Sequence, residues 1–238
     1  MADQRAATFL SDTMLWFQIR EYRDADYSSV RTLYSTGFRE HVGNVYRLAL
    51  KQPCTQAMLC GVFLLIYIFS SSFLTCIMGV GGVMLAGRMA VQYIFEQGIR
   101  LGLNEDLLDI RNSYMQTGSR SCFWVAELKG SIVGTVGILP CVEETGAWEL
   151  KRISVKREFR GRGLAKALCK SAMEFVARHD VKRVVLFTSV VQTDAHKLYD
   201  SIGFKKEKEF VWPSLPARLI NFVVFKYAHS RTGCVISC

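Results

Sequence analysis

The stretch SVKREFRGRGLAKALCKSAMEFV, from Ser154 to Val176, decides how this chain is interpreted. Two glycines and two arginines lie between a strand-like segment and a segment with helical periodicity. The first turn of a helix carries unpaired amides and the positive end of the helix dipole, and glycine lets a ligand approach the backbone closely. The stretch therefore predicts a cradle for phosphate or pyrophosphate, with a glycine-rich turn without a ligand as the alternative. The pattern GxxxxGK[ST] is absent and the pattern GxGxxG is broken here.

The segments around this turn alternate between strand and helix patterns. Lys129 and Gly130 predict a tight hairpin turn within residues 121–140. Asp24 predicts the N-cap of a helix that starts near Ala25. The order, a strand and a helix followed later by β-β-β-α-β-α-β, predicts an α/β fold with a mixed sheet flanked by helices. The expected strands are 16–22, the two halves of 121–140, 147–155, 181–189 and 218–228, and the expected helices after the first are 104–116, 164–179 and 193–204.

An uncharged tract of 36 residues, 52–87, follows the first expected helix. A helix that crosses a bilayer needs about 20 residues, so the tract is too long for one straight span and tight for two. Three serines at 70–72 lie near its middle, where a turn would fall. Arg47 and Lys51 before the tract and Arg88 after it favour both ends on the cytosolic side. We therefore predict a membrane-embedded helical hairpin, with a buried soluble core or a single tilted span as the alternatives.

Composition limits the possible partners. The formal net charge of +9 suits an anionic ligand, nucleic acid or an anionic membrane surface, but the charged clusters are short and we expect no nucleic-acid partner. The eight cysteines form no CxxC pair and the four histidines are scattered, so we expect reduced cysteines and no metal centre. The N-terminal segment lacks a signal-peptide pattern. Cys234 and Cys238 are either acylation sites or unmodified cysteines.

Two motifs, in this order along the chain, resemble one family. The segment RGRGLA, Arg160–Ala165, is similar to the acetyl-CoA loop [Q/R]xxGx[G/A] of the GNAT N-acetyltransferases. The segment DAHKLYDSIGF, Asp194–Phe204, resembles a later segment of that family with a Leu-Tyr pair and a Gly-Phe pair. SCFWVAELKGSIVG, AKAL and the apolar tract resemble its camello-like branch, and the match covers 17–227. VGILP leans toward the branch members that acetylate cysteine S-conjugates, whereas ELKRISV and FRGRG lean toward those that acetylate aspartate.

The resemblance implies a site for acetyl-CoA and two catalytic residues. The pantetheine arm would lie along residues 152–155, where amides near Ile153 and Val155 polarise the thioester carbonyl. Glu149 would accept the proton of the attacking amine, and Tyr199 would supply a proton to the departing thiolate. A solvated strand carboxylate and a packed tyrosine are the structural alternatives. The loop residues expected to bind the pyrophosphate are Arg160, Gly161, Arg162, Gly163, Leu164 and Ala165.

The expected function is a membrane-anchored N-acetyltransferase that moves the acetyl group of acetyl-CoA to the amine of a small amino-acid derivative, cysteine S-conjugate-like or aspartate-like. A protein lysine acceptor, in reticulum proteins or histones, and a non-catalytic acetyl-CoA-binding module are the alternatives. We expect the endoplasmic reticulum membrane, with the catalytic domain in the cytosol. The expected parts are an N-terminal strand and helix in 1–51, the hairpin in 52–87, the acetyltransferase core in 88–228 and a tail in 229–238.

Overall fold

The computed structural model describes residues 17–116, 118, 120–179 and 181–230, so the N-terminal segment, Cys234 and Cys238 lie outside the described residues. Within these residues the core is a seven-stranded sheet in the order β1-β2-β3-β4-β5-β7-β6. β4 and β5 pair in parallel and all other neighbours pair antiparallel, which confirms the predicted mixed sheet. The strands are β1 (Gln18–Glu21), β2 (Cys122–Leu128), β3 (Ser131–Pro140), β4 (Trp148–Val155), β5 (Arg183–Ser189), β6 (Lys205–Val211) and β7 (Val223–Ser230).

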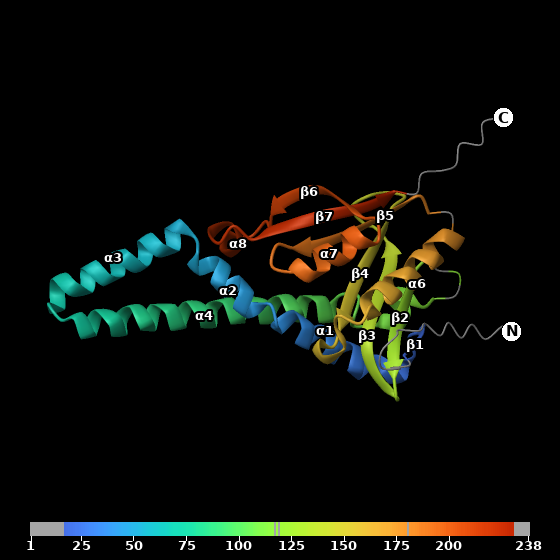
Figure 1. Cartoon of the computed structure of the whole chain (residues 1–238), viewed down its shortest axis with the longest axis horizontal. Helices are drawn as coiled ribbons and strands as arrows, with labels where there is room; N and C mark the ends of the chain where they lie inside the picture. The colour runs from blue at the N-terminus through green and yellow to red at the C-terminus, as the bar shows by residue number, and fades with distance from the viewer. Residues whose placement is uncertain (1–16, 117, 119, 180, 231–238) are drawn as a thin grey trace.

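Helices cover both faces of the sheet (Figure 1). In the described part of the chain they are α1 (Tyr27–Arg39), α2 (Val42–Leu50), α3 (Pro53–Ser70), α4 (Phe73–Asn104), α5 (Ile110–Tyr114), α6 (Leu164–Arg178), α7 (Thr193–Ser201) and α8 (Leu215–Leu219), with short 3₁₀ turns η1 (Asp24–Asp26) and η2 (Arg157–Phe159).

The alternating side chains of β2 explain why both faces are covered. Phe123 and Val125 pack on one face with residues of α1 and α5. Trp124 and Ala126 pack on the other face with residues of α6. Successive strand residues point to opposite faces, so a strand that is apolar at every position needs a layer on each side. The glycine-rich turn therefore leads into α6 on one face, while α1 and the end of α4 lie on the other.

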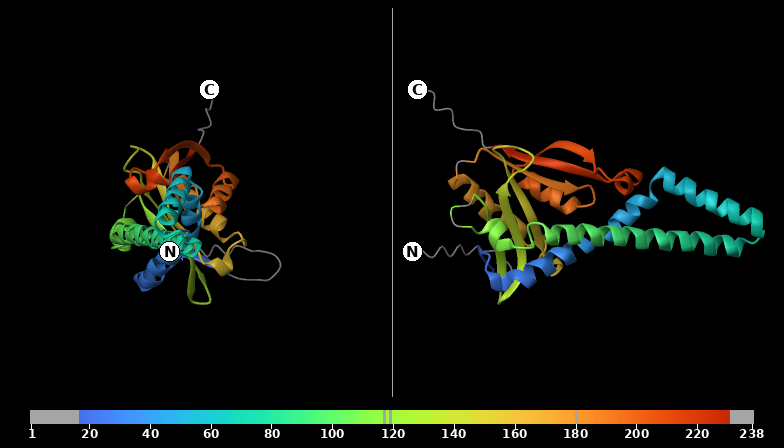
Figure 2. Two further views of the ribbon diagram at one scale, coloured as in Figure 1. Left: turned by 90° about the vertical axis from the view of Figure 1, so that its left-hand side faces the viewer. Right: turned by 180° about the vertical axis from the view of Figure 1, so that it is seen from behind.

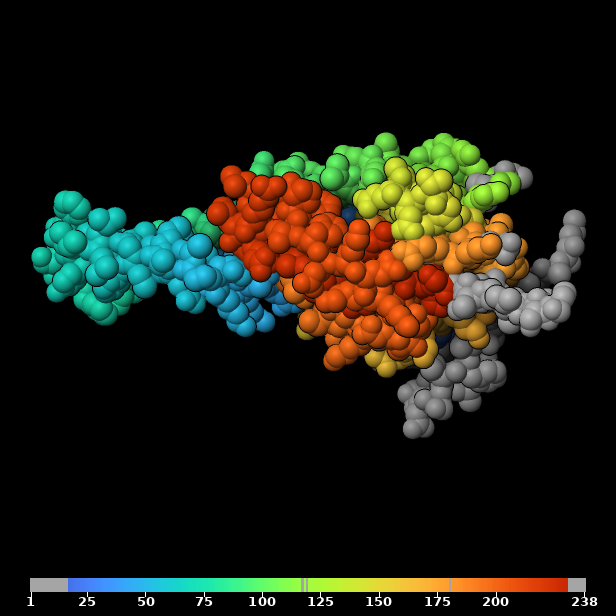
Figure 3. Space-filling model, turned by 90° about the horizontal axis from the view of Figure 1, so that it is seen from above, coloured from blue at the N-terminus to red at the C-terminus, as the bar shows by residue number. Residues whose placement is uncertain are grey.

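α3 and α4 form a helical hairpin that projects from the sheet (Figures 1 and 2) and extends beyond the rest of the chain (Figure 3). Ser71 ends α3 with a φ of 50°, and across the turn the Ser70 and Thr75 hydroxyl oxygens are 2.6 Å apart. Gly79 allows close approach of the two helices, because a Cβ there would overlap the Ile66 side chain. The predicted hairpin shape and its turn at the serines are confirmed.

α4 continues past the hairpin as one helix and ends against the sheet. About three quarters of the way along this helix, Glu96 accepts hydrogen bonds from Arg39 of α1, the longer of them 2.9 Å. The rings of Phe38 and Phe95 pack with their centres 5.7 Å apart. At its end, Gly102 touches α1, because a Cβ there would overlap the Tyr34 hydroxyl. The hairpin and the sheet are therefore joined by a continuous helix rather than by a linker.

Local predictions were correct at one turn and wrong at four places. Of the expected helix 104–116 only α5 (Ile110–Tyr114) forms beyond the end of α4, and the expected strand 218–228 begins only at Val223, because residues 215–219 form α8. The other two errors concern Asp24 and β6. Lys129 and Gly130 have φ of 48° and 78° and form the expected tight turn between β2 and β3. Asp24 does not cap α1; it begins η1, and α1 starts only after Asp26. The strand β6 was not predicted at all, because its sequence KKEKEFV is exposed at every position and has no apolar face.

Candidate active site

The predicted phosphate cradle forms where the chain leaves β4 and enters α6. Gly161 and Gly163 have φ of 73° and 77°, a left-handed conformation that glycine adopts without strain. Gly163 directly precedes α6, and no side chain caps this end of the helix. No group in the described part of the chain accepts a hydrogen bond from the amides of residues 161–166. The turn therefore presents a run of unpaired N–H groups at the positive end of a 15-residue helix, which is the arrangement that binds phosphate.

The side chains of this loop contribute unequally. Leu164 is buried and Ala165 packs against the same core, so only their amides can face a ligand. The Arg160 guanidinium is already engaged, because it donates to a carbonyl of β4 at 2.9 Å and to Glu40 at 2.6 Å. Arg162 is exposed and has no acidic partner among the described residues. Arg160 thus holds the turn in shape, while Arg162 leaves its charge free for an anion.

β4 and β5 pair over a short distance and then separate. Trp148 lies opposite Val184 and Glu149 lies opposite Val185, and these are the pairs between the two strands. Farther along, β4 pairs with β3 and β5 pairs with β7. Residues 150–155 of β4 therefore have an edge that pairs with no other strand in the described residues. This edge leads to the cradle, and it includes the predicted contact residues near position 153.

A β-bulge lies in the middle of the open edge. Arg152 and Ile153 together oppose the single residue Val136 of β3. Arg152 has a φ of 58°, which is uncommon for a residue with a side chain, and its carbonyl accepts a hydrogen bond from the Thr135 hydroxyl at 2.9 Å. A bulge disrupts the regular pairing of the strand and changes the direction of its backbone groups. The backbone is thus irregular at Ile153, where the sequence predicts contact with the thioester carbonyl.

The Arg152 side chain anchors this bulge through a buried ion pair. Its Nε lies 2.9 Å from a carboxylate oxygen of Asp106, and its guanidinium lies 4.9 Å from the centre of the Tyr34 ring. The Tyr114 hydroxyl donates to the same carboxylate. The side chains of Arg152 and Asp106 are 11% and 9% exposed. Burial alone would raise the pKa of Asp106, but the hydrogen bonds and charge of Arg152 hold that pKa below its ordinary value.

Sequence reasoning missed this cluster. Asp106 and Arg152 are 46 residues apart in the chain, and no local motif joins them. The sequence offered one indication: Asp106 and Arg152 are charged residues within an expected amphipathic helix and an expected strand, each of which packs against the core. Buried charges are rare unless they are paired, so two isolated opposite charges of this kind are candidates for each other.

Glu149 lies where β4 and β5 separate. Its side chain is 16% exposed, and one of its carboxylate oxygens is 3.8 Å from the Lys151 ammonium. Burial raises the pKa of Glu149 above its ordinary value, and the Lys151 charge partly opposes that rise. A carboxylate with a raised pKa accepts a proton more readily than a solvated one. Position and environment therefore suit the predicted proton acceptor.

Tyr199 lies on α7 and is buried. Its ring centre is 5.8 Å from that of Tyr227 and 6.2 Å from that of Phe204. Burial raises its pKa, so the hydroxyl keeps its proton near neutral pH. This hydroxyl makes no hydrogen bond within the described residues, and no hydrogen bond there joins Tyr199 to Glu149. The two predicted catalytic residues thus lie on separate elements.

Other candidate nucleophiles and ligands have structural surroundings. Cys122 and Cys169 are buried, and burial raises the pKa of each thiol to about 12, so both remain protonated and unreactive. His196 Nε2 lies 3.0 Å from the Ser189 carbonyl oxygen, and its ring packs against aromatic residues of β7. Within residues 17–230, apart from the gaps noted above, no three potential metal ligands come together.

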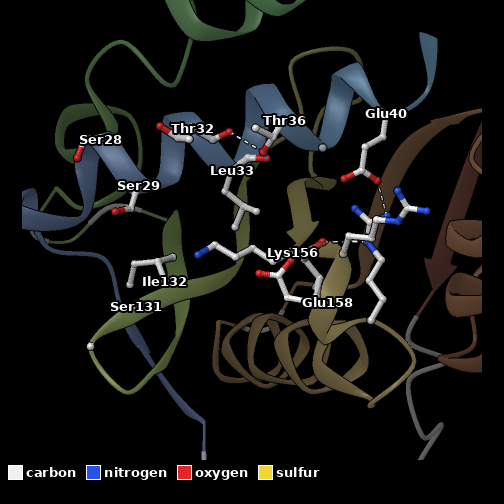
Figure 4. Close-up of a pocket in the computed structure, with 15 residues that line it drawn as sticks. Ser28, Ser29, Thr32, Leu33, Thr36, Glu40, Ser131, Ile132, Lys156 and Glu158 are labelled. Carbon is white, nitrogen blue, oxygen red and sulfur yellow. Dashed lines mark hydrogen bonds and ion pairs between the residues drawn. The ribbon is translucent and has the colours of Figure 1, made fainter. Parts of the chain in front are cut away.

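A cavity of about 530 Å³ lies beside the loop, between α1, the β2–β3 turn and residues 155–160 (Figure 4). Serine and threonine hydroxyls of α1 line one wall, and Lys156 points into the space (Figure 4). The ion pair between Glu40 and Arg160 lies at one end. The lining includes neither Glu149 nor any residue of α7, so this cavity is separate from the predicted catalytic residues.

Comparison with known proteins agrees with this architecture. Residues 87–204 match the Acetyltransferase (GNAT) family. The probable N-acetyltransferase camello of Xenopus tropicalis is 31% identical over 89% of this chain and 96% of its own length. The N-acetylaspartate synthetase of Rattus norvegicus is 34% identical over 90% of this chain and 72% of its own length. The crystal structure of a GNAT acetyltransferase from Staphylococcus aureus has the same fold, with a TM-score of 0.55 and 17% identity over 90% of this chain and 98% of that one.

The two sequence relatives each align with about nine-tenths of this chain, and the solved structure shows the same fold. The motif that begins α6 lies inside the matched family region. The chain therefore belongs to the GNAT acetyltransferase family, in its camello-like N-acetyltransferase branch, and is an acetyl-CoA-dependent N-acetyltransferase.

Proposed function

We propose that this enzyme is anchored in a membrane by the α3–α4 hairpin and acetylates the amine of a small amino-acid derivative, cysteine S-conjugate-like or aspartate-like. The main support for this reaction site is the run of unpaired amides at residues 161–166. These residues follow β4, which has an open edge. The amides bind the pyrophosphate of acetyl-CoA. The pantetheine arm, which has amide groups of its own, pairs with the edge at 150–155 as an added strand.

The proposed reaction has two proton transfers, one at each predicted catalytic residue. The amine nitrogen attacks the thioester carbonyl carbon, and an amide N–H near Ile153 stabilises the developing oxyanion. Glu149 takes the proton of the amine, directly or through one water. The C–N bond forms, the C–S bond breaks, and Tyr199 donates its proton to the coenzyme A thiolate. The raised pKa of Glu149 supports its role as proton acceptor, and the raised pKa of Tyr199 keeps its hydroxyl protonated near neutral pH, so that a proton is present to donate.

Two observations support an amino-acid acceptor. The rat relative that is 34% identical is an N-acetylaspartate synthetase. Lys151 lies next to Glu149 and its side chain is only partly buried, so it offers a positive charge to an acceptor carboxylate near the base. An α-amine beside a carboxylate is common to aspartate and to cysteine S-conjugates, whereas a protein lysine has no such group.

A competition assay tests the acceptor class. The full chain in detergent receives acetyl-CoA with aspartate, a cysteine S-conjugate and a lysine peptide together, and the products are separated by mass. We expect an acetylated amino-acid derivative as the main product. Acetyl-lysine peptide as the main product would contradict the acceptor class and favour the protein-lysine alternative. Binding of acetyl-CoA without thiol release for any amine would favour the non-catalytic module.

The exposure of α3 and α4 supports the membrane anchor. Both helices have the length and composition of a membrane span, and in their most apolar windows 0% and 6% of residues are buried. The core helix of a soluble protein would be largely buried, and a signal sequence would lie nearer the N-terminus than Pro53. Burying these side chains in lipid removes the exposed apolar surface. We assign the anchor to the endoplasmic reticulum, with both flanks of the hairpin and the catalytic domain in the cytosol.

Alkaline carbonate extraction and protease protection of reticulum vesicles test the anchor. We expect the chain to stay in the membrane pellet and the catalytic domain to be digested from the cytosolic side. Release of the intact chain by carbonate would contradict insertion, and protection of the catalytic domain would contradict its orientation. Neither result depends on the acetyl-transfer assay.

A further inference from the structure

A second exposed apolar surface lies outside the hairpin. It consists of Phe210, Val211, Trp212, Leu215 and Leu219, which we call the tip patch. Leu215 is 72% exposed, Leu219 is 62% exposed and Trp212 is 49% exposed. Among the described residues outside α3 and α4, the other large exposed apolar side chains are single residues far apart in sequence. Scattered residues of that kind need no explanation, but a cluster of five calls for a partner.

The tip patch is held in place by its own backbone. The Trp212 amide donates to the Phe222 carbonyl at 3.0 Å, and the Phe222 amide donates to the Ala217 carbonyl at 2.8 Å. Ala217 is the buried residue of α8, so it fixes which side of that helix faces inward. Leu215 and Leu219 are four residues apart and point outward together. The apolar exposure is therefore a property of an ordered segment.

The tip patch lies at the end of the catalytic domain that faces the hairpin. α8 lies beside the junction of α2 and α3 in both side views (Figures 1 and 2), and the same segment borders α2 from above (Figure 3). α3 is 18 residues long, about 27 Å, and Arg88 lies 15 residues into α4, about 22 Å from the hairpin turn. Lys51 and Arg88 therefore mark nearly the same depth, where the hairpin leaves the lipid. The tip patch is at about this level.

Composition favours the interfacial region of a bilayer as the partner. Tryptophan is enriched at the boundary between lipid tails and headgroups, and exposed arginine and lysine bind anionic headgroups. The tip patch contains Trp212 and borders Arg218, and the exposed basic residues Arg47 and Lys51 lie at the base of the hairpin. A stable dimer buries about 800 Å² on each partner through about 20–30 residues a side, which is far more than the five residues of the tip patch. The lipid surface that the hairpin already enters needs no such area.

We infer that the tip patch inserts into the interface of the same bilayer as the hairpin and acts as a second membrane contact. This inference rests on the proposed membrane anchor. With the hairpin alone, the domain could rotate about α4. With two contacts, the domain has one orientation, and the end of β6 and the start of β7, next to α8, face the membrane surface (Figure 1).

Quenching of Trp212 by brominated lipid tests this inference. The full chain is reconstituted into vesicles of phosphatidylcholine and phosphatidylserine, with or without bromine on the lipid tails near the headgroup. The Trp212 signal is the difference in emission between the wild type and Trp212→Phe. We expect brominated vesicles to remove most of this difference. The double variant Leu215→Ser, Leu219→Ser should lose most of the quenching and stay attached to vesicles in flotation, because the hairpin is unchanged.

The matched control is Val142→Ser, which removes an exposed apolar side chain far from the tip patch in sequence and should leave quenching unchanged. An equal rate of acetyl transfer by all variants in detergent confirms that they fold. The inference would be overturned by the following result. The wild type floats with the vesicles, acrylamide in the buffer quenches Trp212, and brominated lipid does not. Protection of Trp212 from both quenchers would also overturn it, since a second copy or a protein would then cover the patch. Failure of the wild type to float would instead contradict the membrane anchor.

Discussion

Arg152 of the open-edged strand β4 forms a buried ion pair with Asp106, the second residue after α4 ends. α4 is also the second helix of the hairpin, so one rigid helix links the apolar projection to the bulge beside the predicted thioester contact. Tyr34 of α1 and Tyr114 of α5 complete the cluster. The bulge is thus held by three elements on the face of the sheet opposite α6.

Replacing Asp106 by Ala is expected to destabilise the protein strongly, because Arg152 would keep a buried charge without a partner. Loss of one member of a buried pair costs about 3–5 kcal/mol, which corresponds to a fall of roughly 6–20 °C in the thermal midpoint of a domain of this size. The control is Asp24→Ala, which breaks the exposed ion pair between Asp24 and Arg111 and should change the midpoint little. Thermal unfolding of the detergent-solubilised variants measures both midpoints. Equal midpoints for Asp106→Ala and Asp24→Ala would show that the buried ion pair stabilises the protein no more than the exposed one.

Replacing Glu149 by Gln is expected to lower the rate of acetyl transfer by about 10²–10⁴-fold near neutral pH, which is the usual contribution of a general base. Burial raises the Glu149 pKa above its ordinary value, so in the wild type the base becomes active as pH rises through that raised pKa. The variant should lack that acid limb. Its deficit should shrink below the Glu149 pKa, where the wild-type carboxyl is protonated, and again at high pH, where the amine is already free. Thiol release measured across pH tests this.

A neighbouring carboxylate provides the control for Glu149. Glu143 is exposed, and its negative charge contributes to the raised pKa of Glu149. Glu143→Gln should keep the rate and move the acid limb of the profile slightly toward lower pH. Identical pH profiles for wild type and Glu149→Gln would remove Glu149 from the mechanism, whatever the behaviour of Glu143→Gln.

Replacing Gly163 by Glu is expected to abolish acetyl-CoA binding, because a side chain with a negative charge would enter the cradle that binds the pyrophosphate. Gly163 also has a φ of 77°, so any side chain there adds backbone strain. The control for strain is Gly146→Glu, at a turn with a φ of 83° and open space around the added Cβ. Calorimetric titration with acetyl-CoA should show normal binding by this control. Undiminished binding by Gly163→Glu would place the coenzyme elsewhere.

Most of the fold could be predicted because its strands and helices have clear apolar periods. Both halves of 121–140 and the segment at 164–179 form the expected strands and helix, and the serines at 70–72 form the expected turn. β6 could not be predicted from hydrophobic periodicity, because a strand whose side chains are exposed to solvent needs no apolar face. Charged residues on such an edge strand also protect it from aggregation. Hydrophobic pattern therefore identifies buried strands and misses exposed ones.

The candidate site was predictable only where its chemistry is local in sequence. The glycines at 161 and 163 are informative because a left-handed turn and free amides depend on neighbouring residues. The partner of Arg152 is 46 residues away, and its position depends on where α4 ends and how α5 packs. The engagement of Arg160 by Glu40 likewise joins the loop to α1. Long-range ion pairs follow from tertiary packing, which no local pattern contains.

Replacing Gly102 by Val tests whether the packing of α4 supports catalysis at a distance. A Cβ at this position would overlap the Tyr34 hydroxyl and lie 2.9 Å from an Arg152 guanidinium nitrogen, so the cluster must shift. Overpacking of this kind costs about 1–3 kcal/mol. The control is Gly98→Val, one turn earlier on α4, where nothing lies within 4 Å of the added Cβ and the change in helix propensity is the same. Gly102→Val should lower kcat while leaving the KM for acetyl-CoA nearly unchanged, because the bulge near Ile153 moves and the amides of the cradle, on the other face of the sheet, do not. Steady-state kinetics of the two variants decide the question: equal kcat values would mean that the cluster contributes to stability alone, and a rise in KM for Gly102→Val would mean that it also shapes the coenzyme site.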